Sequence, residues 1–153
     1  MQHIITLRDA APGDIETIFN IRTAVKENHL SREQMAEMGI TPQTVLEIIN
    51  ESRCIWIAEV NGQAAGFAMA ITGEACLFAM FVTPEFEGLG VGKKLLRKAE
   101  SCLFSTCQNI WLETASSSRA AAFYQRHGWM PVSKSGESDI RFEKSHPEPG
   151  QEI

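Results

Sequence analysis

The apolar positions of this chain follow two spacings, one typical of helices and one typical of strands. Apolar residues three or four positions apart form one stripe of a helix, whereas short apolar or alternating runs form strands. By this criterion we expect helices at residues 14–26, from Thr41-Pro42 onward, at 91–105 and at 120–127. The shorter runs predict strands at residues 4–9, 54–59, 63–71, 76–82, 110–113, 130–134 and 140–144.

Three local signals strengthen this pattern. Asn61-Gly62 lies between two apolar runs, where it predicts a tight hairpin turn. Thr41 and Pro42 suit the cap and the first position of a helix. The run at 76–82 is almost wholly apolar, which indicates a central strand with both faces covered. We therefore expect an α/β domain with a mixed sheet.

Composition fits one domain and excludes several classes of function. With 153 residues, 44% of them hydrophobic, the chain can bury one core. The net charge of −5 argues against a nucleic-acid-binding surface, which needs clustered cations. The sequence has no apolar run long enough to cross a membrane and no basic leader. We expect a cytoplasmic protein that contacts neither membrane nor nucleic acid.

The cysteines give no sign of a metal site. They have no C-x-x-C pairing and lie in or beside apolar segments, as expected of reduced thiols in the core. The histidines are equally scattered along the chain, so we expect no bound metal. The cysteines are Cys54, Cys76, Cys102 and Cys107.

Residues 81–93 carry the clearest chemical signal. An apolar strand runs into three alternate glycines, Gly88, Gly90 and Gly92, and then directly into an amphipathic helix. Glycine permits backbone conformations that a side chain would hinder, and the first amides of a helix are donors at the positive end of its dipole. Together these features predict a phosphate site made of main chain.

The spacing of the glycines excludes two common phosphate motifs. A P-loop needs glycine where Glu87 stands, and Ser or Thr in place of Lys94. A dinucleotide-binding fingerprint fails from either of the first two glycines, because its third glycine would fall on Lys93 or Leu95. Neither nucleotide motif is therefore present.

Residues 82–92 resemble the acyl-CoA loop of the GNAT superfamily of N-acetyltransferases, whose pattern is [Gln/Arg]-x-x-Gly-x-[Gly/Ala] after a strand that ends in Val-x-Pro. Here Glu87-Gly88-Leu89-Gly90-Val91-Gly92 follows Val82-Thr83-Pro84. Glu87 departs from the pattern. A carboxylate that points into a pyrophosphate site would repel the pyrophosphate and lower affinity. We favour a side chain that turns outward, because such a loop binds through its amides.

Residues 110–129 resemble a second signature of this superfamily, Asn-x-x-Ala-x-x-Phe-Tyr-x-x-x-Gly-[Phe/Trp]. The segment also predicts a short strand, a serine N-cap and a helix that stops at Gly128. Ser117 stands in place of the Asn, and every other position matches, including Phe123 and Tyr124. An isolated Phe-Tyr pair would indicate core packing, but two signatures in the right order favour a cofactor site.

The resemblance implies the fold of this superfamily over residues 1–144, followed by a frayed tail at 145–153. That fold is a mostly antiparallel sheet of about six to seven strands, splayed between strands four and five and flanked by about four helices. The pantetheine arm of acetyl-CoA enters the gap. By position, the implied cofactor-binding residues are Met80, Phe81, Val82, Gly88, Leu89, Gly90, Val91, Gly92, Lys93 and Ser117.

The resemblance also implies acetyl transfer by direct attack of a primary amine, through a tetrahedral intermediate. A main-chain amide near Met80 or Phe81 would stabilise the oxyanion of that intermediate. Tyr124 occupies the position of the general acid. A phenol with a pKa near ~10 can protonate a thiolate whose conjugate acid has a pKa near ~8.5.

The acceptor side is less defined. In this superfamily the acceptor pocket lies between the first two helices and beside the last hairpin. Trp56 and Trp111 could border it, but we expect core positions for both. The implied acceptor-site residues are Glu27, Asn28, His29 and Glu113. The two glutamates, the histidine or a chain of waters could take the proton of the amine, so the base stays open.

We therefore expect an acetyl-CoA-dependent N-acetyltransferase whose acceptor is a small-molecule or peptide amine. Such folds also allow a homodimer paired through sheet edges or through C-terminal strands. Two other functions stay open. Glu87 and Ser117 would suit a module that binds acyl-CoA as a sensor without turnover. An α/β interaction domain without a cofactor would require both signatures to be accidental.

Overall fold

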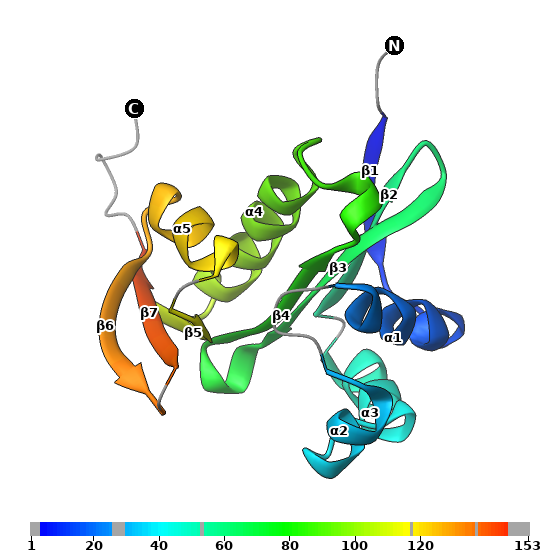
Figure 1. Cartoon of the computed structure of the whole chain (residues 1–153), viewed down its shortest axis with the longest axis horizontal. Helices are drawn as coiled ribbons and strands as arrows, with labels where there is room; N and C mark the ends of the chain where they lie inside the picture. The colour runs from blue at the N-terminus through cyan, green and yellow to red at the C-terminus, as the bar shows by residue number, and fades with distance from the viewer. Residues whose placement is uncertain (1–3, 26–29, 53, 117, 137, 147–153) are drawn as a thin grey trace.

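The computed structural model describes residues 4–25, 30–52, 54–116, 118–136 and 138–146. Within these ranges seven strands form one sheet in the order β1-β2-β3-β4-β5-β7-β6 (Figure 1). Neighbouring strands are antiparallel except for β4 and β5, which are parallel. The strands are β1 (Ile5–Asp9), β2 (Ile55–Val60), β3 (Gln63–Ile71), β4 (Cys76–Val82), β5 (Asn109–Ala115), β6 (Met130–Ser135) and β7 (Asp139–Ser145). The predicted mixed, mostly antiparallel sheet is confirmed.

Five α-helices and three short 3-10 helices occur in the described ranges, one α-helix more than expected. No described helix is long and apolar enough to cross a membrane. The α-helices are α1 (Ile15–Ala24), α2 (Arg32–Glu37), α3 (Pro42–Ser52), α4 (Val91–Phe104) and α5 (Arg119–Arg126). The 3-10 helices are η1 (Pro12–Asp14), η2 (Thr72–Glu74) and η3 (Pro84–Phe86).

The additional helix is α2, which begins with a capping box. The Ser31 hydroxyl accepts a hydrogen bond from the Gln34 amide at 3.1 Å, and the Gln34 side-chain oxygen accepts one from the Ser31 amide at 2.9 Å. This reciprocal pair satisfies two amides that the first turn would otherwise leave without partners. Met35 is the one residue of α2 that is buried.

The predicted turn and cap signals are confirmed. Asn61 and Gly62 have φ values of 50° and 85°, the left-handed conformation that a tight hairpin turn requires. At the start of α3, the amide of Thr44 donates to the hydroxyl of Thr41 at 3.2 Å. Gly128 follows α5 with a φ of 91°, as a helix-ending glycine does.

The sheet divides the interior into two cores. Helices α4 and α5 lie on one side of the sheet, and α1, α2 and α3 lie on the other (Figure 1). The core under α4 and α5 includes residues of β2, β3, β4, β5 and β7. The core under α1 to α3 draws its strand residues from β2, β3 and β4. In the described part of the chain, the matching face of β5, β7 and β6 therefore has no α-helix over it.

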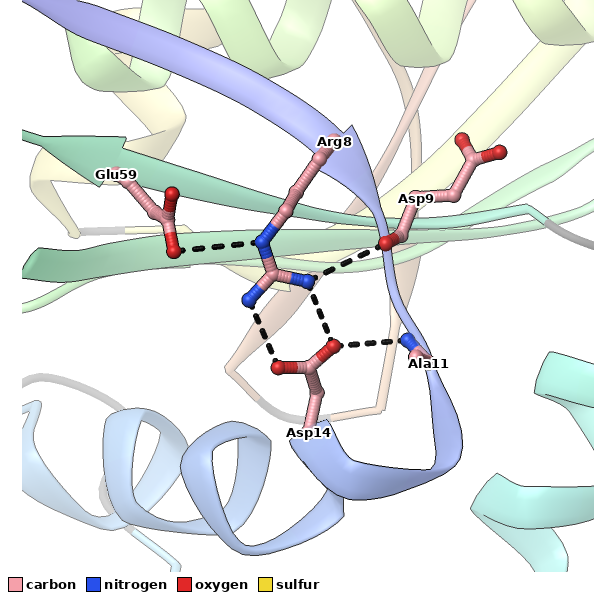
Figure 2. A network of polar contacts seen from close by, with 5 residues as sticks. All are labelled: Arg8, Asp9, Ala11, Asp14 and Glu59. Carbon is pink, nitrogen blue, oxygen red and sulfur yellow. Dashed lines mark hydrogen bonds and ion pairs between the residues drawn. The ribbon is translucent and has the colours of Figure 1, made fainter. Parts of the chain in front are cut away.

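A polar network fixes the start of α1 against β1 (Figure 2). The guanidinium of Arg8 on β1 donates to both carboxylate oxygens of Asp14, at 2.7 and 2.8 Å, and to Glu59 of β2 at 3.3 Å. Asp14 also accepts from the amide of Ala11 at 2.8 Å. The hydrogen bonds from Arg8 lower the pKa of Asp14, although burial opposes this shift.

Strand β7 runs slightly further than the sequence pattern indicates. It includes Ser145, which pairs with Asn109 of β5. The amide of His146 then donates to the carbonyl of Gln108 at 2.8 Å. Backbone pairing beside β5 thus continues as far as residue 146.

Candidate active site

Strands β4 and β5 separate soon after they meet. The parallel pair is registered at one position, Cys76 opposite Trp111, where the amide of Trp111 donates to the carbonyl of Ala75 at 3.0 Å. Beyond it β4 keeps its partners in β3, including Met80 opposite Ala68, but no described residue of β5 pairs with it. The predicted splay is confirmed. The β5-facing edge of β4 can therefore offer main-chain donors and acceptors to a ligand.

A β-bulge in β4 accompanies the splay. Leu77 pairs with Ala70 and Ala79 pairs with Met69, so Phe78 is an extra residue between them. A bulge bends its strand and increases the local twist, which contributes to the separation from β5. Phe78 is 47% exposed. No local signal in the sequence marks this bulge, because the run has neither glycine nor proline.

The glycine loop follows β4 and η3 and ends at the start of α4. Gly88 and Gly90 have φ values of 82° and 93°, a conformation that favours glycine. Gly90 is the N-cap of α4 and has no side chain that could accept from the first amides of the helix. A Cβ atom at Gly88 or Gly90 would meet no atom within 4 Å, so the loop borders open space. These features fit an anionic group held by main chain.

Gly92 has a different environment. A Cβ atom there would lie 3.6 Å from Cζ of Phe123 and 3.9 Å from Cγ2 of Val82. These are ordinary van der Waals distances, so the first turn of α4 lies beside Phe123 of α5 and would have room for a methyl group at this position. Gly92 thus places the glycine loop next to α5.

Glu87 turns toward α5. Its Oε2 atom lies 3.1 Å from Nη1 of Arg119, the first residue of that helix, and the Glu87 side chain is 40% exposed. The carboxylate is therefore engaged by a cation from a distant part of the sequence. This contact joins the two segments that carry the sequence signatures.

Helix α5 is capped by Ser118. Its hydroxyl accepts from the amide of Ala121 at 3.1 Å and donates to the carbonyl of Ala115 at 2.7 Å. Ser117, the predicted cofactor-binding serine, lies outside the described residues. The predicted serine cap is therefore confirmed, and Ser118 provides it.

Tyr124 is buried between α5 and the sheet. Its ring centroid lies 5.9 Å from that of Trp129 and 6.4 Å from that of Phe142. Burial raises the pKa of the phenol, since it disfavours the phenolate. Tyr124 therefore stays protonated near neutral pH and is able to donate its proton.

Of the predicted acceptor-site residues, the structure describes only Glu113. Glu27, Asn28 and His29 lie outside the described residues. Glu113 is exposed on β5, on the far side of the splay from β4, and it is paired in register with Arg141 of β7.

The two tryptophans expected in the core differ. Trp56 is 3% exposed, as predicted. Trp111 is only partly buried, so the core prediction is wrong for this residue. Its indole nitrogen donates to the carbonyl of Glu74 at 2.9 Å, and the guanidinium of Arg141 lies 4.3 Å from its ring centroid. The uncovered face of the sheet at β5 and β7 leaves this side chain half-buried.

Arg22 is a cation that the sequence analysis did not select. It comes from α1, and its guanidinium carbon lies 4.1 Å from the ring centroid of Phe81 in β4. Burial lowers its pKa. The signal in the sequence was an arginine on the stripe of α1 that otherwise packs against the sheet.

The cysteines form no disulfide, and Cys54 and Cys102 bring their sulfur atoms to 3.5 Å. Burial raises the pKa of Cys76 to about 12 and is the largest cause of the rise for Cys102, to about 11. No cluster of three or more His, Cys, Asp or Glu side chains suited to a metal ion occurs among the described residues.

Comparison with known families identifies the class of protein. A family model described as "Acetyltransferase (GNAT) domain" matches residues 51–131, a little more than half of the chain. The matched region contains β2 to β5, the glycine loop, α4 and α5. The chain therefore belongs to the GNAT acetyltransferase family.

Two curated relatives match part of the chain. A ribosomal protein bS18-alanine N-acetyltransferase of Haemophilus influenzae is 37% identical over 75 residues, 47% of this chain and 51% of that protein. An uncharacterized N-acetyltransferase of Methanocaldococcus jannaschii is 32% identical over 81 residues, 50% of this chain and 52% of that protein. The chain thus spans about half the length of the curated relatives it matches.

Solved structures share the whole fold. The PaiA N-acetyltransferase of Thermoplasma acidophilum, in complex with coenzyme A, has a TM-score of 0.78 at 20% identity and covers 94% of this chain and 99% of that one. The ribosomal-protein-S18-alanine N-acetyltransferase of Escherichia coli has a TM-score of 0.71 at 19% identity, with 98% and 99% covered. At these identities the likeness shows the fold.

Proposed function

We propose that this protein transfers an acetyl group from acetyl-CoA to a primary amine. The proposal rests on the meeting of three segments: the end of β4, the glycine loop and the first turns of α5. Gly92 lies against Phe123, and Glu87 pairs with Arg119, so the two sequence signatures are neighbours in space. A long anionic thioester fits such an arrangement, with its phosphates at the loop and its arm along β4.

Main chain would hold most of the cofactor. The amides of residues 88–93 would bind the pyrophosphate, since those of residues 91–93 form the positive end of α4 and Gly90 leaves them without a side-chain cap. The main chain of residues 80–82 would pair with the pantetheine arm, at the edge of β4 that lacks β5 as a partner. An amide near Met80 or Phe81 would stabilise the oxyanion. Ser117 remains a proposed contact.

The reaction needs two proton movements. The amine attacks the thioester carbonyl, so that a C–N bond forms and the C–S bond breaks to release the thiol of CoA. We assign Tyr124 the proton donated to the sulfur, because burial keeps its phenol protonated. The amine must lose a proton, and Glu113 or solvent would accept it. Glu113 is exposed, so it can reach an acceptor amine that enters from solvent.

The acceptor is an amine of a small molecule or of a peptide. One curated relative is named for acetylation of an alanine of a ribosomal protein, so a peptide with an N-terminal alanine belongs in the first set of acceptors tested. A polyamine and free lysine represent the small molecules. A homodimer through the sheet edges is a separate proposal, which the mass in solution would test.

Thermal unfolding with acetyl-CoA tests the cofactor site. A ligand that binds the native state at about 100 times its dissociation constant adds about 2.7 kcal/mol of stability, which raises the melting temperature by several degrees. The absence of any shift at millimolar acetyl-CoA would contradict the proposal. Thiol release from acetyl-CoA, measured with each acceptor, then tests turnover. Binding without release across all acceptors would favour an acyl-CoA sensor instead.

Replacing Tyr124 by Phe tests the proton donor. We expect turnover to fall by about a hundredfold or more, because the thiolate would lose its positioned acid. The melting-temperature shift by acetyl-CoA should be retained, since the ring and its packing remain. Tyr124 is the only tyrosine of the chain, so an ultraviolet titration of phenolate reports this pKa alone. Unchanged turnover in the variant would remove Tyr124 from the mechanism.

A further inference from the structure

The ion pair between Glu87 and Arg119 lies where the glycine loop meets α5. The two charged atoms are 3.1 Å apart, and the Arg119 side chain is 77% exposed. An ion pair with this exposure contributes little to folding, because water and salt screen it. Stability therefore gives little reason for this pair, and a ligand that enters from solvent can reach the guanidinium.

The position of Arg119 on its helix is also unfavourable for a cation. It is the first residue of α5, where the aligned peptide dipoles already give a partial positive charge. Glu87 offsets one of these charges but lies in a loop whose glycines face open space. A carboxylate alone in such a loop would repel an anionic ligand. The pair presents a cation beside the loop and keeps the carboxylate engaged.

A guanidinium can bind a carboxylate and a phosphate at the same time. It has five N–H donors in a fixed plane, so one edge can hold a carboxylate while another binds a phosphate oxygen. The pyrophosphate of CoA carries a negative charge on each phosphoryl group and the 3′-phosphate carries up to two, and hydrogen bonds between ions are stronger than those between neutral groups. A phosphate at the loop would therefore find both the amides of α4 and this guanidinium.

We infer that Arg119 binds a phosphate group of CoA and that Glu87 positions Arg119 for this contact. The inference rests on the proposed acetyl-CoA site and adds a charged side chain to a site that main chain otherwise builds. Glu87 acts through Arg119 and does not touch the cofactor. The phosphate is either part of the pyrophosphate or the 3′-phosphate, and the same guanidinium chemistry serves both.

Calorimetric titration of CoA into four proteins tests the inference. They are the natural chain, Glu87→Gln, Arg119→Gln and the double variant. We expect affinity to fall in the order natural chain, Glu87→Gln, double variant, Arg119→Gln. Loss of Arg119 should weaken binding about tenfold even when residue 87 is Gln, because a charge-assisted hydrogen bond is lost. Arg119→Gln alone should be weakest, because Glu87 then faces the phosphate without its cation.

The effect of Glu87→Gln on CoA affinity should reverse when Arg119 is removed. When Arg119 is present, Glu87→Gln should weaken CoA binding, because the guanidinium loses its orientation. When Arg119 is absent, the same change should strengthen binding, because a repelling charge is removed. A merely structural role for Glu87 would not produce this reversal. Equal affinity of the double variant and Glu87→Gln would overturn the phosphate contact, and tighter binding by Glu87→Gln than by the natural chain would overturn the positioning role.

Truncated ligands and a matched variant complete the test. Pantetheine has no phosphate, so the Arg119→Gln change should leave its affinity unaltered, and a loss there would overturn the inference. Dephospho-CoA lacks the 3′-phosphate. If the tenfold loss persists with it, Arg119 contacts the pyrophosphate; if the loss disappears, the contact is to the 3′-phosphate.

Arg126→Gln serves as the control, because it removes a cation from the exposed far end of the same helix. Its CoA affinity should match that of the natural chain, and a tenfold loss there would reduce the Arg119 effect to general charge and overturn the contact. If the natural chain itself does not bind CoA, the proposed function fails rather than this detail.

Discussion

The two parts of the sheet differ in how they are covered. Strands β1 to β4 form one part, in which β2 to β4 have α1 to α3 on one side and α4 on the other (Figure 1). Strands β5, β7 and β6 have α5 on one side, and their other side leaves Trp111 half-buried. The proposed cofactor gap lies at the border, where cover on both faces ends. The two strands can separate without strain, because each part of the sheet has its own packing.

Helix α4 sets the position of one part relative to the other. It packs on the first part through buried residues such as Leu95 and Leu96. It reaches the second part through Glu100, which accepts from Lys144 of β7 at 3.0 Å and from the indole of Trp129 at 2.9 Å. The same helix begins at the glycine loop, so packing and the proposed phosphate site depend on one element.

The largest effect should come from Gly66→Ala in the doubly covered part. A Cβ atom at Gly66 of β3 would lie 2.6 Å from the carbonyl oxygen of Phe81 in β4, closer than such atoms approach. Because this neighbour is backbone, β4 must shift. We expect a loss of about 3 kcal/mol in the free energy of unfolding by urea, with a weaker acetyl-CoA melting-temperature shift.

Gly73→Ala is the matched control for that change. A Cβ atom there would meet no atom within 4 Å. Its free energy of unfolding should stay within about 0.5 kcal/mol of the natural value. If Gly66→Ala and Gly73→Ala lowered the free energy of unfolding equally, the close approach of β3 and β4 at Gly66 would not be important for stability.

An intermediate effect should come from Glu100→Gln, which weakens the link between α4 and the second part. The variant leaves the Lys144 ammonium without its carboxylate, and both side chains are largely shielded, at 22% and 15% exposure. We expect a loss of about 2 kcal/mol in urea unfolding. Glu143→Gln is the control, because its pair with Arg141 is 41% and 38% exposed and should cost less than about 0.5 kcal/mol. Losses of equal size would remove the proposed role of α4 as the link.

The smallest effect should be the pH dependence that Asp14 gives to the first part. The pKa of Asp14 in the folded protein lies below its ordinary value. The ionised carboxyl therefore stabilises the fold fully at pH values above the ordinary pKa, and this stabilisation is lost as the pH falls through the folded pKa. Because the Arg8 side chain is 42% exposed, we expect only about 1 kcal/mol.

Urea unfolding of Asp14→Asn between pH 7 and pH 3 measures this contribution. The variant should be less stable near neutral pH and should converge with the natural chain in acid. Glu16→Gln is the control, because it removes the carboxylate that pairs with Arg32 and is 68% exposed. It should change neither the free energy of unfolding nor its dependence on pH. A constant difference at every pH would contradict the assignment of the effect to the ionised carboxyl.

Most of the fold could be predicted because apolar spacing decides it. Strand β4 was predicted with its observed bounds, and α4 differed by one residue, since β4 is an unbroken apolar run and α4 has a regular apolar stripe. Helix α2 was missed, because six residues with Met35 as their buried member have no apolar stripe. Its signal was polar: Ser31 and Gln34 form the capping box.

The candidate site was predicted in outline and missed in its side-chain detail. Glycines at fixed spacing report a local conformation, and Gly88 and Gly90 adopt it. The ion pair between Glu87 and Arg119 depends on tertiary structure. The sequence showed that Glu87 departs from the family pattern, but it could not identify Arg119 as its partner. The bulge at Phe78 depends on register with β3, which no local pattern encodes.

Trp111 gives this molecule an optical probe of its own. It occupies the registered pair that joins β4 to β5, and its indole bonds to the carbonyl of Glu74 at 2.9 Å beneath the Arg141 guanidinium. Indole emission responds to hydrogen bonding and to nearby charge. Trp56 and Trp129 are 3% and 1% exposed, and replacing both by Phe would leave Trp111 as the sole tryptophan, which can be excited apart from Tyr124. Stopped-flow fluorescence of that variant would follow the two strands in real time, without any attached dye.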